Sequence, residues 1–141
     1  MTDLFAQINT RIRFNEVDSM GIVWHGSYIK YFEDAREEFG RKFELGYLKI
    51  FSEGFYAPLV NIDFSFKSPL KYGDIARIEI KYNDNEAAKI EFSYKIYNSE
   101  TDILIATGAS TQVFLDKDFK LMLYPPDFFI QWKNKYLNES K

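Results

Sequence analysis

One short stretch of the chain, residues 15–26, gathers most of the side chains that could take part in catalysis. It contains two acids two positions apart, Glu16 and Asp18, and also His25, the only histidine among 141 residues. A carboxylate can attack a carbonyl carbon or activate a water molecule for that attack. Free backbone N–H groups at the start of a helix can stabilise the oxyanion that forms. The stretch therefore predicts a small site for acyl transfer at a helix N-terminus.

A thioester suits a site with so few groups. Its leaving group is a thiol with a pKa of roughly 8.5, which departs as a thiolate without much help from an acid. From the residues alone, simpler interpretations stay open. An Asp-Ser pair before a glycine is ordinary turn chemistry, and a lone His25 beside Trp24 usually packs or forms a local hydrogen bond. We expect Glu16 to be a solvated loop acid.

The sequence lacks the residues that other classes of catalytic site require. There is no cysteine, which excludes disulfide frameworks, thiolate nucleophiles and cysteine-based metal sites. One histidine makes a catalytic zinc site improbable, so we expect no metal and no separate cofactor. Residues 108–112 resemble a Gly-x-Ser-x-Gly elbow only distantly and fall inside a predicted strand. No glycine-rich phosphate loop is present.

The composition is that of a globular protein, with 46% apolar and 28% charged residues. Its length predicts a single domain over residues 1–141. The net charge of −3 argues against nucleic acid as a partner. No run approaches the roughly 20 apolar residues of a transmembrane helix, and the first residues do not form a signal peptide. With no cysteine, a cytoplasmic location is expected.

The elements that would hold residues 15–26 can be predicted from periodicity. Alternation predicts a strand over 8–14, ending with Phe14 on its apolar face. Apolar residues at helical spacing predict one long helix from Ser27 to Lys42, with Ser27 as its N-cap and an end near Gly46. Gly40 is a weak point inside this helix.

From Tyr56 onward the period changes to two, which indicates strands. Residues 60–66 alternate, with Val60, Ile62, Phe64 and Phe66 on one face, and a turn at 68–74 follows. Strands are then predicted at 75–82, 88–97 and 103–115, and a short helix at 128–137 begins after Pro125-Pro126-Asp127. One long helix among five strands predicts an α+β fold, in which a five-stranded antiparallel sheet wraps around the helix.

Residues 11–36 resemble the signature of hotdog-fold acyl-CoA thioesterases of the 4-hydroxybenzoyl-CoA thioesterase type. The resemblance depends on an Asp, a Gly, a His and a helix start in fixed order: Asp18, Gly21, His25 and Tyr28, followed by Glu33 and Arg36. Residues 64–74 are similar to the strand-turn element of the same family. The order of strands and helices agrees over nearly the whole chain, so the hotdog fold is expected.

The resemblance implies specific roles and partners. Asp18 matches the catalytic carboxylate, as nucleophile or general base, and the His25 N–H matches the group that polarises the thioester carbonyl. In some branches the histidine side chain is also proposed to assist. The substrate would be an acyl-CoA, with coenzyme A as part of it, and the protein would be a homodimer or homotetramer with sites at the subunit interface. Two departures stand out: Phe14, where several relatives have Tyr, and Glu16-Val17, where many have Asp-Thr.

Substrate contacts are predicted at Gly21 and Trp24, within the signature, and at Lys67 and Lys71, whose charges suit the phosphates of coenzyme A. Arg77 and Lys89 are further candidates by charge alone. Three alternatives to an acyl-CoA thioesterase stay open: a hotdog hydratase or dehydratase that uses Asp18 and His25 as an acid/base pair, a thioesterase acting on acyl carrier protein, and a non-catalytic acyl-CoA binding module. The acyl group itself cannot be deduced from the residues.

Overall fold

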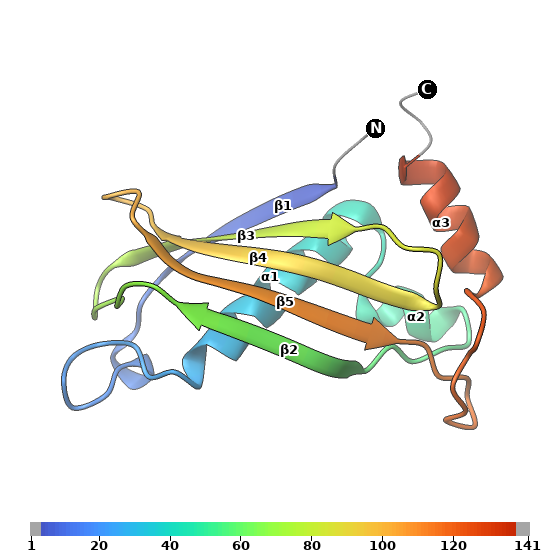
Figure 1. Ribbon diagram of the computed structural model, residues 1–141, viewed down its shortest axis with the longest axis horizontal. Helices are drawn as coiled ribbons and strands as arrows, with labels where there is room; N and C mark the ends of the chain where they lie inside the picture. Colours follow the sequence, from blue (N-terminus) through green and yellow to red (C-terminus); the bar gives the residue numbers. More distant parts are fainter. Residues whose placement is uncertain (1–3, 138–141) are drawn as a thin grey trace.

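The structure, a computed structural model, describes residues 4–137. Five antiparallel strands form one sheet in the order β1-β3-β4-β5-β2, and the long helix α1 lies across one of its faces (Figure 1). The elements are β1 (Phe5–Arg11), η1 (Phe14–Glu16), α1 (Ser27–Phe43), α2 (Tyr47–Ser52), β2 (Leu59–Phe66), β3 (Ile75–Asn83), β4 (Lys89–Asn98), β5 (Leu104–Val113) and α3 (Asp127–Leu137). The predicted α+β architecture is confirmed.

Aromatic side chains attach α1 to the sheet. The buried apolar side chains of the helix recur three or four positions apart, so that they share one face. They are Tyr28, Tyr31, Phe32, Ala35 and Phe39, and Ser27 and Gly40 are buried as well. The Phe32 ring stacks on Phe64 of β2, at 5.3 Å between centroids, and on Tyr94 of β4, at 4.4 Å. Such aromatic pairs add roughly 0.5–1.5 kcal/mol each to the free energy gained by burial.

The helix does not lie centrally on the sheet. It packs mainly against β1 and β3, and the Lys42 ammonium group donates a hydrogen bond to the Phe5 carbonyl of β1 at 2.9 Å. The β2 edge is less covered, and Val60 and Phe66 remain 58% and 53% exposed there. One side of the core is therefore open toward β2.

The first strand is shorter than predicted. It ends at Arg11, and Phe14 begins the 3₁₀ turn η1, where its side chain is 76% exposed. The reason is local: the Glu16 carboxylate accepts a hydrogen bond from the Arg13 N–H at 2.8 Å, which turns the chain out of the sheet. The prediction that Phe14 belongs to the apolar face of this strand was wrong.

The start of α1 also differs from the prediction. Ser27 is the first residue of the helix and Gly26 occupies the N-cap position without a side-chain hydrogen bond. The Ser27 hydroxyl instead donates to the Glu16 carbonyl at 3.3 Å. Its role is to attach the helix to the loop rather than to cap it.

The helix ends at Phe43, where Glu44 adopts a left-handed conformation with φ 58°. The chain then turns into the short helix α2, which sequence periodicity did not predict. This turn is tight because Gly40 and Gly46 touch: a Cβ atom on Gly40 would lie 2.7 Å from the Gly46 Cα. Gly40, which looks like a weak point of the helix, is thus required by a backbone contact.

We expect Gly40→Ala to lower the free energy of unfolding by about 2 kcal/mol, because the added methyl group meets backbone that cannot move independently. Chemical denaturation followed by circular dichroism measures the change. Glu37→Ala, on the exposed side of the same helix, is the control and should change stability by less than about 0.5 kcal/mol. If both variants were equally stable, the turn between α1 and α2 would have to make room for the added methyl group without cost.

Candidate active site

A small antiparallel ladder shapes the loop before α1. Val17 and Val23 form an isolated β-bridge. On one side of it the Asp18 N–H donates to the Ile22 carbonyl at 2.8 Å, and on the other the Trp24 N–H donates to the Glu16 carbonyl at 3.0 Å. Because the loop doubles back on itself, residues far apart in the predicted signature become neighbours along two short paired segments.

Asp18 lies at the closed end of this ladder. Its Oδ1 accepts a hydrogen bond from the Met20 N–H at 2.8 Å, and its carbonyl accepts one from the Gly21 N–H at 3.0 Å. Gly21 has φ 79°, a conformation that favours glycine, so this residue permits the turn. The Asp18 side chain is half-buried. One carboxylate oxygen is thus fixed by the turn, and the orientation of the other follows from it.

His25 and Trp24 lie where the ladder meets α1. Their rings are 4.9 Å apart, and both side chains are exposed. The Trp24 ring lies over Gly26, since a Cβ atom there would be 2.1 Å from the indole. The His25 carbonyl accepts the Tyr28 N–H at 3.3 Å, whereas its own N–H donates no hydrogen bond within residues 4–137. An unpaired N–H at a helix start suits a developing negative oxygen.

Glu16 is buried, so the expectation of a solvated loop acid was wrong. Glu16 is only 3% exposed to solvent. One carboxylate oxygen accepts the Arg13 N–H at 2.8 Å and the other lies 3.1 Å from the Lys30 ammonium group. Burial acts to raise the Glu16 pKa, but these two partners outweigh it and hold the pKa below its ordinary value.

Glu16 is therefore a structural residue of the site that sequence reasoning missed. Its carbonyl accepts from both Trp24 and Ser27, while its side chain reaches Lys30 on the first turn of α1. The neighbouring Tyr31 hydroxyl is buried, and burial together with the Glu16 charge raises the pKa of Tyr31. No clear signal in the sequence indicated this role, because Arg13, three residues before Glu16, is not a residue that caps a helix.

The predicted lysines lie on the segment that follows β2. The Lys67 N–H donates to the Ile105 carbonyl at 2.8 Å, and Lys71 forms an isolated bridge with Ile22. The Tyr72 N–H also donates to the Gly21 carbonyl at 3.3 Å. The structure thus brings Lys71 to the Asp18 loop, with both lysine side chains exposed.

The other two basic candidates are placed differently. Arg77 is paired with Glu79 at 3.0 Å and with Asp102 at 2.7 Å, and its guanidinium lies 4.6 Å from the Tyr97 ring centre. Lys89 begins β4, at the end of the sheet opposite the Asp18 loop in Figure 1. Within one chain neither residue joins the loop.

The sequence of the chain matches the profile of the thioesterase-like superfamily over residues 12–132. The chain belongs to the thioesterase-like superfamily. Two bacterial relatives have provisional names. The acyl-CoA thioesterase YneP of Bacillus subtilis is 28% identical over 130 residues, which span 92% of this chain and 94% of that protein. An esterase of Aquifex aeolicus is 33% identical over 117 residues, which span 83% of this chain and 89% of that protein.

A solved thioesterase structure has the same fold. The crystal structure of Slr0204, a 1,4-dihydroxy-2-naphthoyl-CoA thioesterase from Synechocystis, superposes with a TM-score of 0.82 at 19% identity, over 97% of this chain and 98% of that one. The hotdog fold expected from the signature is thereby confirmed. The expected enzyme class, a thioester hydrolase, is supported by the family match and by the names of the sequence relatives. Within residues 4–137, no helix is both long and apolar enough to cross a membrane.

Proposed function

We propose that the protein hydrolyses acyl-CoA thioesters to a free acid and coenzyme A, with Asp18 as the reacting carboxylate and the His25 N–H as the oxyanion donor. The proposal is carried by one observation: the bridge between Val17 and Val23 closes the loop, which holds Asp18 at its turn and leads His25 from its other end into α1. One of these residues offers a carboxylate, and the other offers an unpaired amide at the N-terminus of α1.

The chemistry requires few groups. As a general base, Asp18 removes a proton from water while the resulting hydroxide attacks the thioester carbonyl carbon. The carbonyl oxygen becomes negative and is stabilised by the His25 N–H. When the tetrahedral intermediate collapses, the C–S bond breaks, coenzyme A leaves as a thiolate, and the proton held by Asp18 returns to the products. In the nucleophilic version Asp18 itself attacks and water cleaves the mixed anhydride.

The relatives support a coenzyme A ester as the substrate. A Prochlorococcus marinus protein named 1,4-dihydroxy-2-naphthoyl-CoA hydrolase is 25% identical over 134 residues, which span 89% of this chain and 86% of that protein. An Arabidopsis thaliana relative, 23% identical, is instead named an acyl-acyl carrier protein thioesterase. Carrier-protein esters are therefore the second candidate substrate. The exposed Lys71, which bridges to Ile22 of the loop, favours the phosphates of coenzyme A.

We further propose that the working unit is a dimer formed through β2. This strand is one of the two edges of the sheet. Along the other edge strand, β1, the Phe5 carbonyl is occupied by Lys42. The β2 edge carries exposed Val60 and Phe66, and an unpaired apolar edge is a template for another strand. Antiparallel pairing of β2 with its copy around a two-fold axis would continue the sheet across both subunits.

A panel of short, long and aromatic acyl-CoAs, with thiol release detected spectroscopically, tests the function. We expect hydrolysis of at least one ester with kcat/KM in the range of roughly 10⁴–10⁸ M⁻¹ s⁻¹. The same acyl groups on carrier protein and water addition to enoyl-CoA complete the comparison. Tight binding of acyl-CoA without release of thiol would favour the binding-module alternative. A cytoplasmic location and the absence of a separate cofactor stay predictions of the sequence.

A further inference from the structure

A group of exposed apolar side chains lies at the end of the sheet away from the Asp18 loop. The connection between β5 and α3 projects there as a turn, near the short helix α2 (Figure 1). Seven large apolar or aromatic residues of these two segments are between 42% and 79% exposed, and we call them the apolar patch: Tyr47, Leu48, Phe51, Phe119, Leu121, Leu123 and Tyr124. An exposed apolar surface of this kind marks an interaction site.

Contacts between aromatic rings make the patch continuous across the two segments. The Tyr47 ring lies 6.3 Å from the Phe51 ring between centroids, and the Phe51 ring lies 5.7 Å from that of Tyr56. Tyr56, which is half-buried, stacks in turn on Phe119 of the turn at 5.1 Å. Residues far apart in the sequence therefore present one surface.

The turn holds its apolar side chains outward in spite of local preferences. Phe119 has φ 62°, a left-handed conformation that a bulky residue rarely adopts. Met122 packs against the core, whereas its neighbours Leu121 and Leu123 are exposed. A phenylalanine at a position that suits glycine, with its ring in solvent, stabilises the isolated chain little. Conflicts of this kind between local preference and structure are expected at functional sites.

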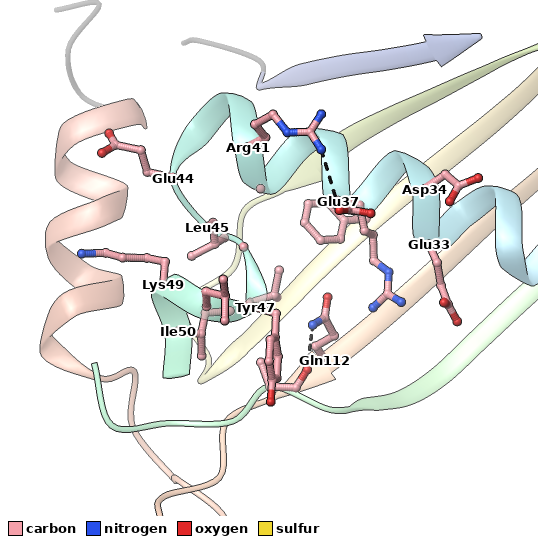
Figure 2. A pocket seen from close by; sticks show the side chains of 17 residues that line it. Glu33, Asp34, Glu37, Arg41, Glu44, Leu45, Tyr47, Lys49, Ile50 and Gln112 are labelled. Carbon is pink, nitrogen blue, oxygen red and sulfur yellow. Dashed lines mark hydrogen bonds and ion pairs between the residues drawn. The ribbon is translucent and has the colours of Figure 1, made fainter. Parts of the chain in front are cut away.

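Neither the proposed dimer nor the cavity near α2 covers the turn. Leu115 forms bridges with Tyr56, which precedes β2, and with Leu121 of the turn. Because an extended segment has one neighbour on each side, Leu121 lies on the side of Leu115 away from β2, and pairing through β2 leaves it exposed. A cavity of about 710 Å³ lies between α1, α2 and the sheet (Figure 2). Tyr47 and Leu48 line it, but none of the described residues 114–124 does.

The charges around the patch suit a lipid surface. Asp116, Lys117, Asp118 and Lys120 cancel one another, and the Asp116 Oδ1 closes the turn by accepting the N–H groups of Asp118 and Lys120 at 2.8 and 3.0 Å. The Lys117 ammonium group lies 3.3 Å from the centre of the Phe51 ring. Tyrosines and lysines beside apolar side chains are typical of segments at a membrane–water interface. A protein partner would be recognised by a hollow or by complementary charge, whereas this patch projects and has no net charge.

We propose that the apolar patch inserts into the interfacial region of a lipid bilayer and attaches the protein reversibly to membrane surfaces. Burial of the patch supplies the free energy of attachment, and the ammonium groups of Lys117 and Lys120 contact headgroup phosphates. Because the local charges cancel, attachment depends little on anionic lipid or on salt. The anchor is small, comparable to a single acyl chain with a partition constant of about 10⁴ M⁻¹.

Co-sedimentation with phosphatidylcholine vesicles tests the attachment. We expect wild type to bind with a partition constant of about 10⁴ M⁻¹, and the double variant Leu121→Ser/Leu123→Ser to bind at least about tenfold more weakly. Ile103→Ser, which changes an apolar residue outside the patch that is 52% exposed, should keep wild-type binding. Replacing about a third of the lipid by phosphatidylserine, or raising NaCl from about 0.1 M to about 0.5 M, should change the constant by less than about threefold. Thermal melting checks that each variant is folded.

A tryptophan placed in the turn reports insertion directly. In Leu123→Trp, vesicles should shift the added fluorescence to shorter wavelength, and lipids brominated on their acyl chains should quench it. Ile103→Trp should show neither effect, and the native Trp24 and Trp132, which lie outside the patch, give the same background in both variants. Phe119→Gly is the second test of the turn. Glycine suits the backbone at φ 62°, so this variant should fold and yet bind vesicles more weakly than wild type.

Three results would overturn the proposal. The first is no binding of wild type to either kind of vesicle, or equal binding by wild type and the double variant. The second is binding that requires phosphatidylserine and disappears at high salt, which would assign attachment to lysines instead. The third is an oligomer of wild type that the double variant dissociates in sedimentation equilibrium while vesicles are ignored, which would make the patch an interface between copies of this chain. None of these measurements depends on hydrolysis, so they decide the matter even if no acyl-CoA is cleaved.

Discussion

Asp18→Asn is expected to lower kcat/KM for every acyl-CoA that the wild type cleaves by about a thousandfold, because the amide can neither remove a proton from water nor attack the carbonyl carbon. The fold should be unaffected. The Asn side chain keeps a carbonyl oxygen in the place of Oδ1, and this oxygen can still accept the Met20 N–H that closes the turn. Steady-state kinetics with thiol detection, beside thermal melting, measures both effects.

The chain provides a matched control for this substitution in Asp116. Its Oδ1 accepts the Asp118 N–H at 2.8 Å, the same distance and spacing that Asp18 forms with Met20. Both side chains are half-buried, but Asp116 belongs to a turn after β5. Asp116→Asn should therefore keep wild-type kinetics and a similar melting temperature. Wild-type hydrolysis by Asp18→Asn would show that the carboxylate has no catalytic role.

Periodicity was enough to predict the elements that carry the site. The spacing of Tyr28, Phe32, Ala35 and Phe39 defines one buried face, and the structure buries that face against the sheet. The alternation in strands β3 and β4 is equally clear, since their buried and less buried residues alternate. Such patterns are long enough to establish a period. The six residues of α2 are not, and its position depends on the contact between Gly40 and Gly46.

The site was predicted only in part, because motif spacing says nothing about burial. The signature identified the loop and the helix start, and the structure closes that loop with the bridge between Val17 and Val23. The signature did not reveal that Glu16 is buried, because this burial depends on its ion pair with Lys30 of α1. This burial arises from packing between elements.

Glu16→Ala is expected to lower the free energy of unfolding by about 3 kcal/mol, because it leaves the Arg13 N–H unpaired and the Lys30 ammonium without its counterion. Turnover should fall as well, since Glu16 fixes the loop that holds Asp18. Urea denaturation measures the stability change. Glu38→Ala removes a more exposed acid, which pairs with Arg41 at 2.8 Å, and should cost less than about 1 kcal/mol.

The pH dependence gives an independent check on the same carboxylate. Because the folded state lowers the pKa of Glu16, the folded state binds its proton less readily than the unfolded state does. The stabilisation is fully present above about pH 4.3, the ordinary value for Glu, and is lost as the pH falls through the lower folded pKa. Glu16→Gln, which cannot titrate, should thus lose less stability than wild type between neutral pH and about pH 3. If the free energy of unfolding fell equally for the two proteins over this pH range, the ionised Glu16 would contribute nothing to holding the loop against α1.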